Sequence, residues 1–360
     1  MGVLRRRGEL DHAIGQVVRR PLSKLDPEVL CALRIGAYQL LRLDRVPAHA
    51  AVSESVELVK SAGKRSASGL TNAALRKIGK VETSSGDDGL NAPEWLRTRW
   101  QGRFGLDVAQ RVVEASLRAP ETFLRLNPQF DATETIGLLR AEGVEVAETD
   151  VAGAYRVVSG RTRGSKTIGG GRASVQDLGS QAVVALLGLQ PGMRLLDVCA
   201  APGGKAQAAS ERLGAEAVVA CDLHPHRLRK MRALGSGTVA LVAADAARAL
   251  RPGVRFDRVL VDAPCSGTGT LGRNPEIKWR LQPGDIEDLA RRQEALLRAA
   301  LERVAEGGAV VYSTCSLEGE ENERVVARGA GEGWRIDEHL ERVPGREAGD
   351  GFWAARLVRA

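Results

Sequence analysis

The chain has 360 residues, of which 43% are hydrophobic and 27% are charged, and it carries a net charge of +7. It has enough apolar residues for folded cores, which excludes a wholly disordered chain, and no apolar run of the length that a transmembrane helix needs. Five cysteines without regular spacing, and no Cys-x-x-Cys pair, argue against a disulfide framework and a structural zinc site.

The N-terminus has basic residues without an apolar segment behind them, so no secretory signal is expected. With the cysteine pattern, this predicts a cytoplasmic protein. The charge is unevenly placed: residues 1–80 contain 15 Lys and Arg against 7 Asp and Glu, and the other residues contain 37 against 38. This excess favours an anionic partner for the first segment, although a merely solvated basic surface fits equally well.

Residues 1–80 are expected to form an all-helical domain. Their apolar residues recur every three or four positions, which places them on one face of successive helices. The stripes run through residues 30–41, 52–59 and 70–78, separated by Pro47 and Gly63. The polar, glycine-containing stretch that follows predicts a linker over residues 81–92.

Residues 93–172 are expected to form a small α+β domain. Pro93 is typical of a helix start, and residues 132–141 have helical spacing. Short strands are expected at residues 123–126, 144–146 and 155–158. Between Asp150 and Asp177 lie five basic residues, several glycines and no acidic residue, which predicts a mobile basic loop. Such a loop suits phosphate contact, and an ordinary solvated loop is the equal alternative.

Residues 173–360 are expected to form an α/β domain. Four apolar runs suit buried strands, at residues 194–199, 217–222, 258–262 and 309–313, and a long helical stripe from Ile286 to Val304 lies between the last two. Strands that alternate with helices predict a doubly wound, Rossmann-like parallel sheet. Ligands of such sheets bind at the carboxyl ends of the strands.

The first strand of this sheet leads into a glycine-containing turn, Cys199-Ala-Ala-Pro-Gly-Gly-Lys205. Gly203 and Gly204 allow the backbone to approach a ligand closely, and the N-terminus of the next helix, with Lys205, suits an anionic group. The turn lacks the spacing of a dinucleotide-binding motif, and a glycine pair after a strand is often only a tight turn.

Acidic residues follow the next three strands. Asp222 and Asp262 end the second and fourth apolar runs, and Asp245 follows the run from Val239 to Val242, which suits a third strand. An acid about 20 residues after a glycine-rich turn commonly binds ribose hydroxyls. The three carboxylates are therefore expected at one crevice with the turn.

Two cysteines also follow predicted strands, in polar surroundings. Cys265 stands in Asp-Ala-Pro-Cys-Ser-Gly (262–267), and Cys315 stands in Tyr-Ser-Thr-Cys-Ser (312–316). A lone cysteine is usually an inert, buried residue, and we assign Cys31 and Cys221 to that class. Two cysteines at the ligand edge of a sheet are instead candidates for nucleophilic chemistry.

The three motifs at 199–205, 262–267 and 312–316, in this order, resemble those of the NOL1/NOP2/Sun RNA cytosine-5 methyltransferases. Flanking segments at 126–128, 175–181, 273–279 and 350–352 fit the same family. Residues 1–80 resemble a NusB-type RNA-binding domain, a fusion similar to the bacterial 16S ribosomal RNA methyltransferases of the Sun type. Family members usually carry a further helix or so before the segment that matches residues 2–7, so we expect either a misplaced start site or a trimmed helical domain.

The resemblance implies an enzyme that uses S-adenosylmethionine, without a metal, to methylate carbon 5 of a cytidine in 16S ribosomal RNA. It implies that Cys315 is the nucleophile, that Cys265 assists product release, and that Asp262 approaches the target base. The cofactor-binding residues that it implies are Cys199, Ala200, Ala201, Pro202, Gly203, Gly204, Lys205, Asp222, Asp245 and Asp262.

The chemistry of this reaction explains the residue types. Carbon 5 of cytosine is a poor nucleophile until a thiolate adds at carbon 6 and converts the ring to an enamine. Charge that develops at ring N3 needs an acid or a hydrogen bond, and the thiol must finally leave. Cys315, Asp262 and Cys265 supply such a set.

Three alternatives remain at this stage. The first is the same reaction on transfer RNA, against which the helical N-terminal domain speaks. The second is a DNA cytosine-5 methyltransferase with Cys265 as nucleophile, which the Thr-Cys-Ser motif disfavours. The third is a non-catalytic RNA-binding protein, suggested by residues 1–80 alone.

Overall fold

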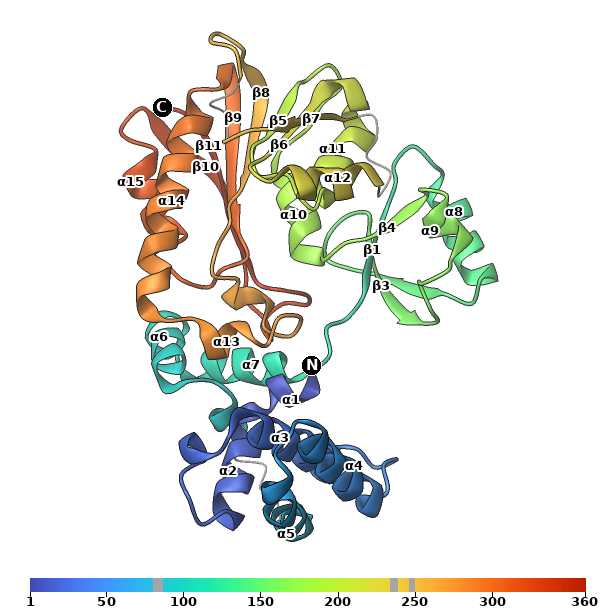
Figure 1. The fold of residues 1–360 in the computed structure, drawn as a ribbon. Coiled ribbons are helices and arrows are strands. Elements are labelled where there is room, and N and C mark those ends of the chain that lie inside the picture. The colour runs from blue at the N-terminus through green and yellow to red at the C-terminus, as the bar shows by residue number, and fades with distance from the viewer. Residues whose placement is uncertain (80–86, 234–238, 246–249) are drawn as a thin grey trace. The chain divides into compact units, whose positions relative to one another are not determined.

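The computed structural model describes residues 1–79, 87–233, 239–245 and 250–360. The chain divides into two compact units (Figure 1). The first unit comprises Met1–Ala119 and Leu271–Arg280, and the second comprises Pro120–Thr270 and Leu281–Ala360. Within the described part of the chain, no helix has the length and apolar character needed to cross a membrane.

Among the residues that the structure describes, the first unit contains helices and no strands, as the spacing of its apolar residues predicts. Its helices are α1 (Gly2–Arg5), α2 (Arg7–Val17), α3 (Pro27–Arg42), α4 (Ala48–Ser61), α5 (Ser68–Ile78), α6 (Glu94–Phe104), α7 (Leu106–Leu117) and α13 (Ile277–Arg280). The three predicted stripes lie in α3, α4 and α5, where Leu33, Val59 and Leu75 meet in a fully buried core.

The segment Leu271–Arg280 belongs to this helical unit, although in sequence it follows the first cysteine motif. Lys278 is fully buried, and its Nζ donates to the carbonyl oxygen of Arg5 at 3.0 Å and to Oγ of Ser116 at 3.1 Å. The indole of Trp279 donates to the carbonyl oxygen of Leu4 at 2.7 Å. Burial and the nearby charges of Arg5 and Arg6 lower the pKa of Lys278 to about 7.

The second unit begins with a small antiparallel sheet of order β2-β3-β1-β4. It consists of β1 (Phe123–Leu126), β2 (Glu145–Glu148), β3 (Ala154–Ser159) and β4 (Ala173–Val175), with α8 (Ala132–Ala141) and α9 (Lys166–Gly169). The three predicted strands and the predicted helix are confirmed. The expected loop between Asp150 and Asp177 is more regular than predicted, because it contains β3, α9 and β4. The carboxylate of Glu142 secures α9 by accepting from the backbone N–H and the hydroxyl of Thr167.

The stretch expected as one domain, residues 93–172, is shared between the two units. Helices α6 and α7 belong to the helical unit because α7 packs against α1 and against η3 (Asp87–Asn91), while β1 to β3 and α8 belong to the second unit. Of the predicted linker over residues 81–92, residues 81–86 lie outside the described part of the chain.

A seven-stranded sheet of order β10-β11-β9-β8-β5-β6-β7 forms the larger part of the second unit. Its strands are β5 (Leu195–Asp197), β6 (Val218–Asp222), β7 (Ala240–Ala243), β8 (Phe256–Asp262), β9 (Val304–Thr314), β10 (Trp334–Arg342) and β11 (Phe352–Arg359). The five strands β5 to β9 are parallel, as predicted. The sheet as a whole is mixed rather than parallel, because β11 pairs antiparallel with both β9 and β10.

Helices cover both faces of this sheet (Figure 1). They are α10 (Leu178–Leu186), α11 (Gly204–Leu213), α12 (Pro225–Ala233), α14 (Pro283–Leu301) and α15 (Glu323–Gly329). One buried cluster joins the sheet to α14 and α15, and a second joins it to α10, α11 and α12. This is the doubly wound arrangement in which the carboxyl ends of neighbouring parallel strands form a binding crevice.

Candidate active site

The glycine-containing turn follows β5 and opens α11. Gly203 has φ of +110°, a left-handed conformation that side chains disfavour, and it stands directly before the first residue of α11. Asp222, at the end of β6, holds the turn, since its Oδ2 accepts from the backbone N–H of Ala201 at 3.3 Å and from Arg227 at 3.0 Å. Its Oδ1 accepts from the backbone N–H of His224 at 2.9 Å.

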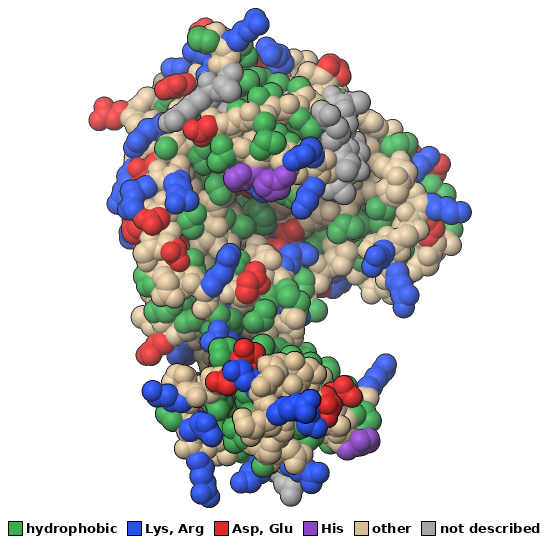
Figure 2. All heavy atoms as spheres, in the orientation of Figure 1, with side chains coloured by type: hydrophobic (Ala, Val, Ile, Leu, Met, Phe, Trp, Pro, Cys, Tyr) green, Lys and Arg blue, Asp and Glu red, His purple; other side chains and the backbone are tan. Residues whose placement is uncertain are grey.

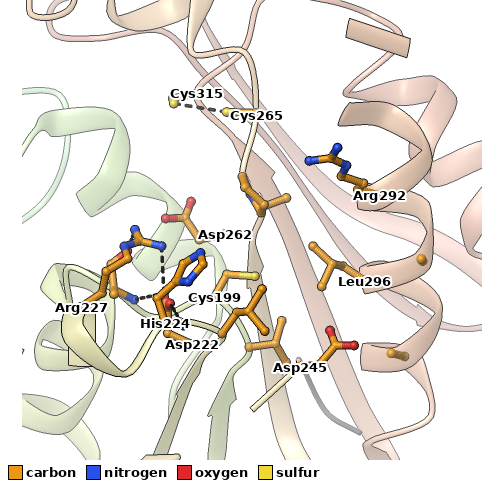
Figure 3. Close-up of a pocket in the computed structure, with 17 residues that line it drawn as sticks. Cys199, Asp222, His224, Arg227, Asp245, Asp262, Cys265, Arg292, Leu296 and Cys315 are labelled. Atoms are coloured by element: carbon orange, nitrogen blue, oxygen red, sulfur yellow. Dashed lines mark hydrogen bonds and ion pairs between the residues drawn. The ribbon is translucent and has the colours of Figure 1, made fainter. Parts of the chain in front are cut away.

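A cavity of about 610 Å³ opens at this edge of the sheet (Figure 3). The site residues predicted from the sequence that line it are Cys199, Ala201, Asp222, Asp245, Asp262, Cys265 and Cys315. The other predicted members of the turn, Ala200, Pro202, Gly203, Gly204 and Lys205, do not line it. The carboxyl ends of five parallel strands thus bring most of the predicted residues to one place.

Other residues on the cavity wall were not predicted, among them His224, Arg227, Arg292 and Leu296. Arg227 lies on α12, and its guanidinium also donates to the carbonyl oxygen of Ala201 at 2.6 Å. Arg292 and Leu296 lie one turn apart on α14 and face the cavity in Figure 3. The spacing of α14 predicts a helix, but nothing in the sequence tells which of its exposed residues borders a ligand site.

The two motif cysteines meet because β8 and β9 are parallel neighbours. Asp262 pairs in register with Ser313, so Cys265 and Cys315 follow the two strand ends at nearly the same level. Their Sγ atoms are 3.3 Å apart, and both residues are half-buried (Figure 3). The hydrogen bond with Cys315, together with burial, raises the pKa of Cys265 well above its ordinary value.

An ion pair lies beside the cysteines. Nζ of Lys205 donates to Oδ2 of Asp262 at 2.7 Å, and the hydroxyl of Ser313 donates to Oδ1 at 3.1 Å. Burial alone would lower the pKa of Lys205, but the charges of Asp262, Cys315 and Asp197 raise it above its usual value. The turn residue Lys205 therefore holds Asp262, the carboxylate for which the family resemblance implies a role near the target base.

A second carboxylate beneath the turn has unusual surroundings. Asp197, the last residue of β5, is buried, and its Oδ1 accepts from the backbone N–H of Cys199 at 3.3 Å. Its Oδ2 has no hydrogen-bond partner among the described residues. Burial, followed by the charge of Asp262, raises the pKa of Asp197 to about 7.

The cavity suits the cofactor expected from the sequence. The carboxylates of Asp222 and Asp245 can accept from ribose hydroxyls, and three acidic residues on the wall favour a ligand with cationic groups. Leu223 and Leu296 add apolar surface for a flat ring. S-adenosylmethionine combines these features, since it carries ribose hydroxyls, an adenine, an ammonium group and a positively charged sulfur.

Comparison with known proteins agrees with this fit. The family described as 16S rRNA methyltransferase RsmB/F matches residues 184–358, and the NusB family matches residues 1–80. The chain is 32% identical to the probable ribosomal RNA small subunit methyltransferase B of Bacillus subtilis, over 90% of this chain and 77% of the relative.

Two further relatives extend the comparison. The chain is 34% identical to the ribosomal RNA small subunit methyltransferase B of Xanthomonas campestris, over 99% of this chain and 87% of the relative. The crystal structure of PH0851 superposes with a TM-score of 0.84 at 25% identity, covering 99% of this chain and 87% of that one. The chain therefore belongs to the 16S rRNA methyltransferase RsmB/F family and is an S-adenosylmethionine-dependent RNA methyltransferase.

Proposed function

We propose that this enzyme methylates carbon 5 of a cytidine in 16S ribosomal RNA through a covalent bond between Cys315 and carbon 6 of the base. The observation that carries the proposal is the contact between the Cys265 and Cys315 sulfurs, 3.3 Å apart on the wall of the cofactor cavity. Methyl transfer to a ring nitrogen or a ribose hydroxyl would not need a thiol nucleophile, whereas carbon 5 of cytosine does.

Activation of the base requires two groups of this chain. The Cys315 thiolate forms a bond to carbon 6, and the electrons of the carbon 5–carbon 6 double bond move toward carbon 4 and N3. The Lys205–Asp262 pair, with its 2.7 Å hydrogen bond, supplies the proton or hydrogen bond that N3 then needs. When bound in the cavity, S-adenosylmethionine supplies the electrophilic methyl group that carbon 5 accepts.

Release reverses the first step. The proton on carbon 5 passes to solvent, a proton taken up by N3 returns to the Lys205–Asp262 pair, the double bond between carbons 5 and 6 forms again, and the bond from carbon 6 to Cys315 breaks. The departing sulfur takes the electron pair and becomes a thiolate. The Cys265 thiol is positioned to donate a hydrogen bond to it, and the raised pKa keeps Cys265 in the protonated form that can donate.

The choice of 16S ribosomal RNA rests on the relatives and on residues 1–80. Relatives over nearly the whole chain are named ribosomal RNA small subunit methyltransferases. The segment that matches the NusB family carries 15 basic against 7 acidic residues, and Figure 2 shows exposed Lys and Arg side chains interspersed with Asp and Glu on the face in view. A basic surface supplies the phosphate contacts that a large RNA offers.

The test is transfer of labelled methyl from S-adenosylmethionine to separate pools of unmodified 16S, 23S and transfer RNA, with Cys315→Ala as control. Label on carbon 5 of a 16S cytidine, lost in the variant, is the expected result. Label only on transfer RNA would keep the mechanism and overturn the substrate. Label on another atom of the base, or retained in Cys315→Ala, would contradict the mechanism.

A further inference from the structure

Behind the two cysteines lies a carboxylate that the reaction described above does not use. Glu321 stands in the loop between β9 and α15, and its side chain is buried, with an exposed fraction of 0%. Among the residues that the structure describes, it forms no ion pair with a basic side chain. Burial of a carboxylate destabilises the folded protein unless hydrogen-bond donors satisfy its oxygens. The hydrogen-bond partners of Glu321 therefore indicate its structural role.

Four hydrogen bonds satisfy Glu321. Its Oε1 accepts from the backbone N–H of Ser266 at 2.8 Å and from Nε2 of Gln293 at 2.9 Å. Its Oε2 accepts from the hydroxyl of Ser266 and, at 2.5 Å, from the hydroxyl of Ser316. Ser266 directly follows Cys265, and Ser316 directly follows Cys315. One buried group therefore binds both cysteine loops.

Rigid elements hold Glu321 in this place. The hydroxyl of Tyr312, a residue of β9, donates to the backbone carbonyl oxygen of Glu321 at 2.6 Å. Gln293 of α14 donates to the carbonyl oxygen of Pro264 at 3.0 Å as well as to the carboxylate. The two cysteine loops are thus anchored to strand β9 and to helix α14, as well as to each other.

We propose that Glu321 is a positioning residue whose carboxyl group holds the loops of Cys265 and Cys315 together through its hydrogen bonds, so that the two thiols stay in contact while the methylated base is released. The inference rests on the proposed function, because it concerns the release step assigned to Cys265. Glu321 does not line the cofactor cavity and does not touch the reacting atoms.

The charge of Glu321 also acts on the thiol. The pKa of Cys265 is raised first by its hydrogen bond with Cys315 and by burial, and then by the negative charges of Cys315 and Glu321. Burial raises the pKa of Glu321 itself, while the hydrogen bonds from Ser266, Ser316 and Gln293 act in the opposite direction. An ionised Glu321 favours the thiol form of Cys265, which is the form that donates to the departing sulfur.

The experiment measures the covalent protein–RNA adduct on denaturing gels, with S-adenosylmethionine and the RNA pool that accepts the methyl label. The full-length wild type is compared with Cys265→Ala, Glu321→Ala and Glu321→Gln. Glu294→Gln is the control, because Glu294 is a partly buried acid of α14 that pairs with Arg298 and Arg328 instead. Binding of S-adenosylmethionine is measured for each variant by calorimetry.

We expect Glu321→Ala to accumulate the adduct as Cys265→Ala does, with turnover lowered about 10- to 100-fold, the effect of a misplaced catalytic group. Its affinity for S-adenosylmethionine should be unchanged. Glu321→Gln should restore most of the turnover, because the amide oxygen can accept from Ser266 and Gln293 while its NH₂ donates to the two hydroxyls. Merely damaged folding would instead lower adduct, turnover and cofactor binding together, and the second readout described next then decides. A folded Glu321→Ala that releases the RNA as fast as the wild type would overturn the proposal.

A second readout covers the case in which Glu321→Ala does not fold. In a Cys315→Ala background, alkylation of Cys265 is followed against pH by peptide mass spectrometry, with and without Glu321→Gln. Removal of the negative charge should lower the apparent pKa of Cys265, seen as faster alkylation at a fixed pH below it. An unchanged alkylation profile would overturn the proposal.

The failure of this inference and the failure of the proposed function differ in outcome. If Cys265→Ala accumulates the adduct and a folded Glu321→Ala does not, the positioning role of Glu321 is wrong and the proposed function stands. If Cys265→Ala itself accumulates no adduct, the release role of Cys265 is wrong, and the inference about Glu321 falls with it.

Discussion

The cavity has two ends that are built in different ways. At the cofactor end, the ends of β5, β6 and β7 present a backbone turn and single carboxylates, of which Asp245 is exposed. At the cysteine end, a buried network of side chains joins the loops that follow β8 and β9, centred on Glu321. A ligand that binds and leaves each turnover needs an open wall, whereas two thiols that must act in sequence need fixed geometry.

The largest effect is expected at the cysteine end. Cys315→Ala removes the group that bonds to carbon 6, so methyl transfer should fall by about a thousandfold or more, as for loss of other covalent nucleophiles. Cofactor affinity should be unchanged. The matched control is Cys31→Ala, because Cys31 lies on α3 and is exposed rather than buried as the sequence analysis expected, whereas Cys221 is buried as expected. Methyl transfer is measured with labelled cofactor. Substantial transfer by Cys315→Ala would show that Cys315 is not the nucleophile and that the cysteine end does not carry the chemistry.

Lys205→Met tests the ion pair that lies between the two ends. It removes the 2.7 Å hydrogen bond to Asp262, so the rate of transfer should fall about 100-fold or more, the usual range for loss of proton-transfer assistance. Because Lys205 does not line the cavity, the cofactor affinity should change little. Single-turnover rates and calorimetry separate the two quantities, and a loss of affinity alone would assign Lys205 to the cofactor end.

Asp222→Asn should affect the other end. The carboxylate anchors the turn and Arg227 and faces the cavity, so affinity for S-adenosylmethionine should fall about 10- to 100-fold, the effect of losing charged hydrogen bonds. At saturating cofactor, the turnover number should remain close to that of the wild type. A fall in turnover with unchanged affinity would show that the two ends are not separate.

The smallest effect concerns stability. Burial raises the pKa of Asp197 from 3.8 in its ordinary state to about 7 in the folded protein. The contribution of Asp197 to stability is therefore fully present below its pKa in the unfolded chain. It is lost as pH rises through its pKa in the folded protein, because Asp197 ionises more easily in the unfolded chain. Between pH 5 and 8, Tm should fall by several degrees more in the wild type than in Asp197→Asn. Equal slopes in thermal melts would show that this carboxylate does not titrate near pH 7.

The sequence predicts the parallel half of the sheet well, for a physical reason. Strands β5, β6 and β8, and β9 from Gly308 onward, are largely buried, so they are nearly continuous apolar runs that stand out from their surroundings. Strands β10 and β11 were not predicted: β10 carries charged residues from Arg335 to Arg342 and is mostly exposed at the sheet edge. Its pairing partner β11 secures it, and such pairing leaves no strong signal in either strand alone.

The candidate site divides in the same way. The cysteines and strand-end acids could be named from motifs, because a parallel sheet brings its carboxyl ends together. Glu321 could not be identified from the sequence, because it lies in Glu318-Gly-Glu-Glu-Asn-Glu323, where nothing distinguishes it from the other three glutamates. Only the loop conformation places Glu321 against Ser266 and Ser316. Arg227 and Arg292 were not predicted as cavity residues, because arginines are common throughout this chain and no motif marks these two.

The most direct test of the central claim is the site of the covalent bond in the Cys265→Ala enzyme. After reaction with RNA and S-adenosylmethionine, the adduct is digested with nuclease and protease and analysed by mass spectrometry. The account predicts one methylated cytidine attached to the peptide that contains Cys315. Attachment to any other peptide, or a Cys315 adduct on a base other than cytosine, would contradict it.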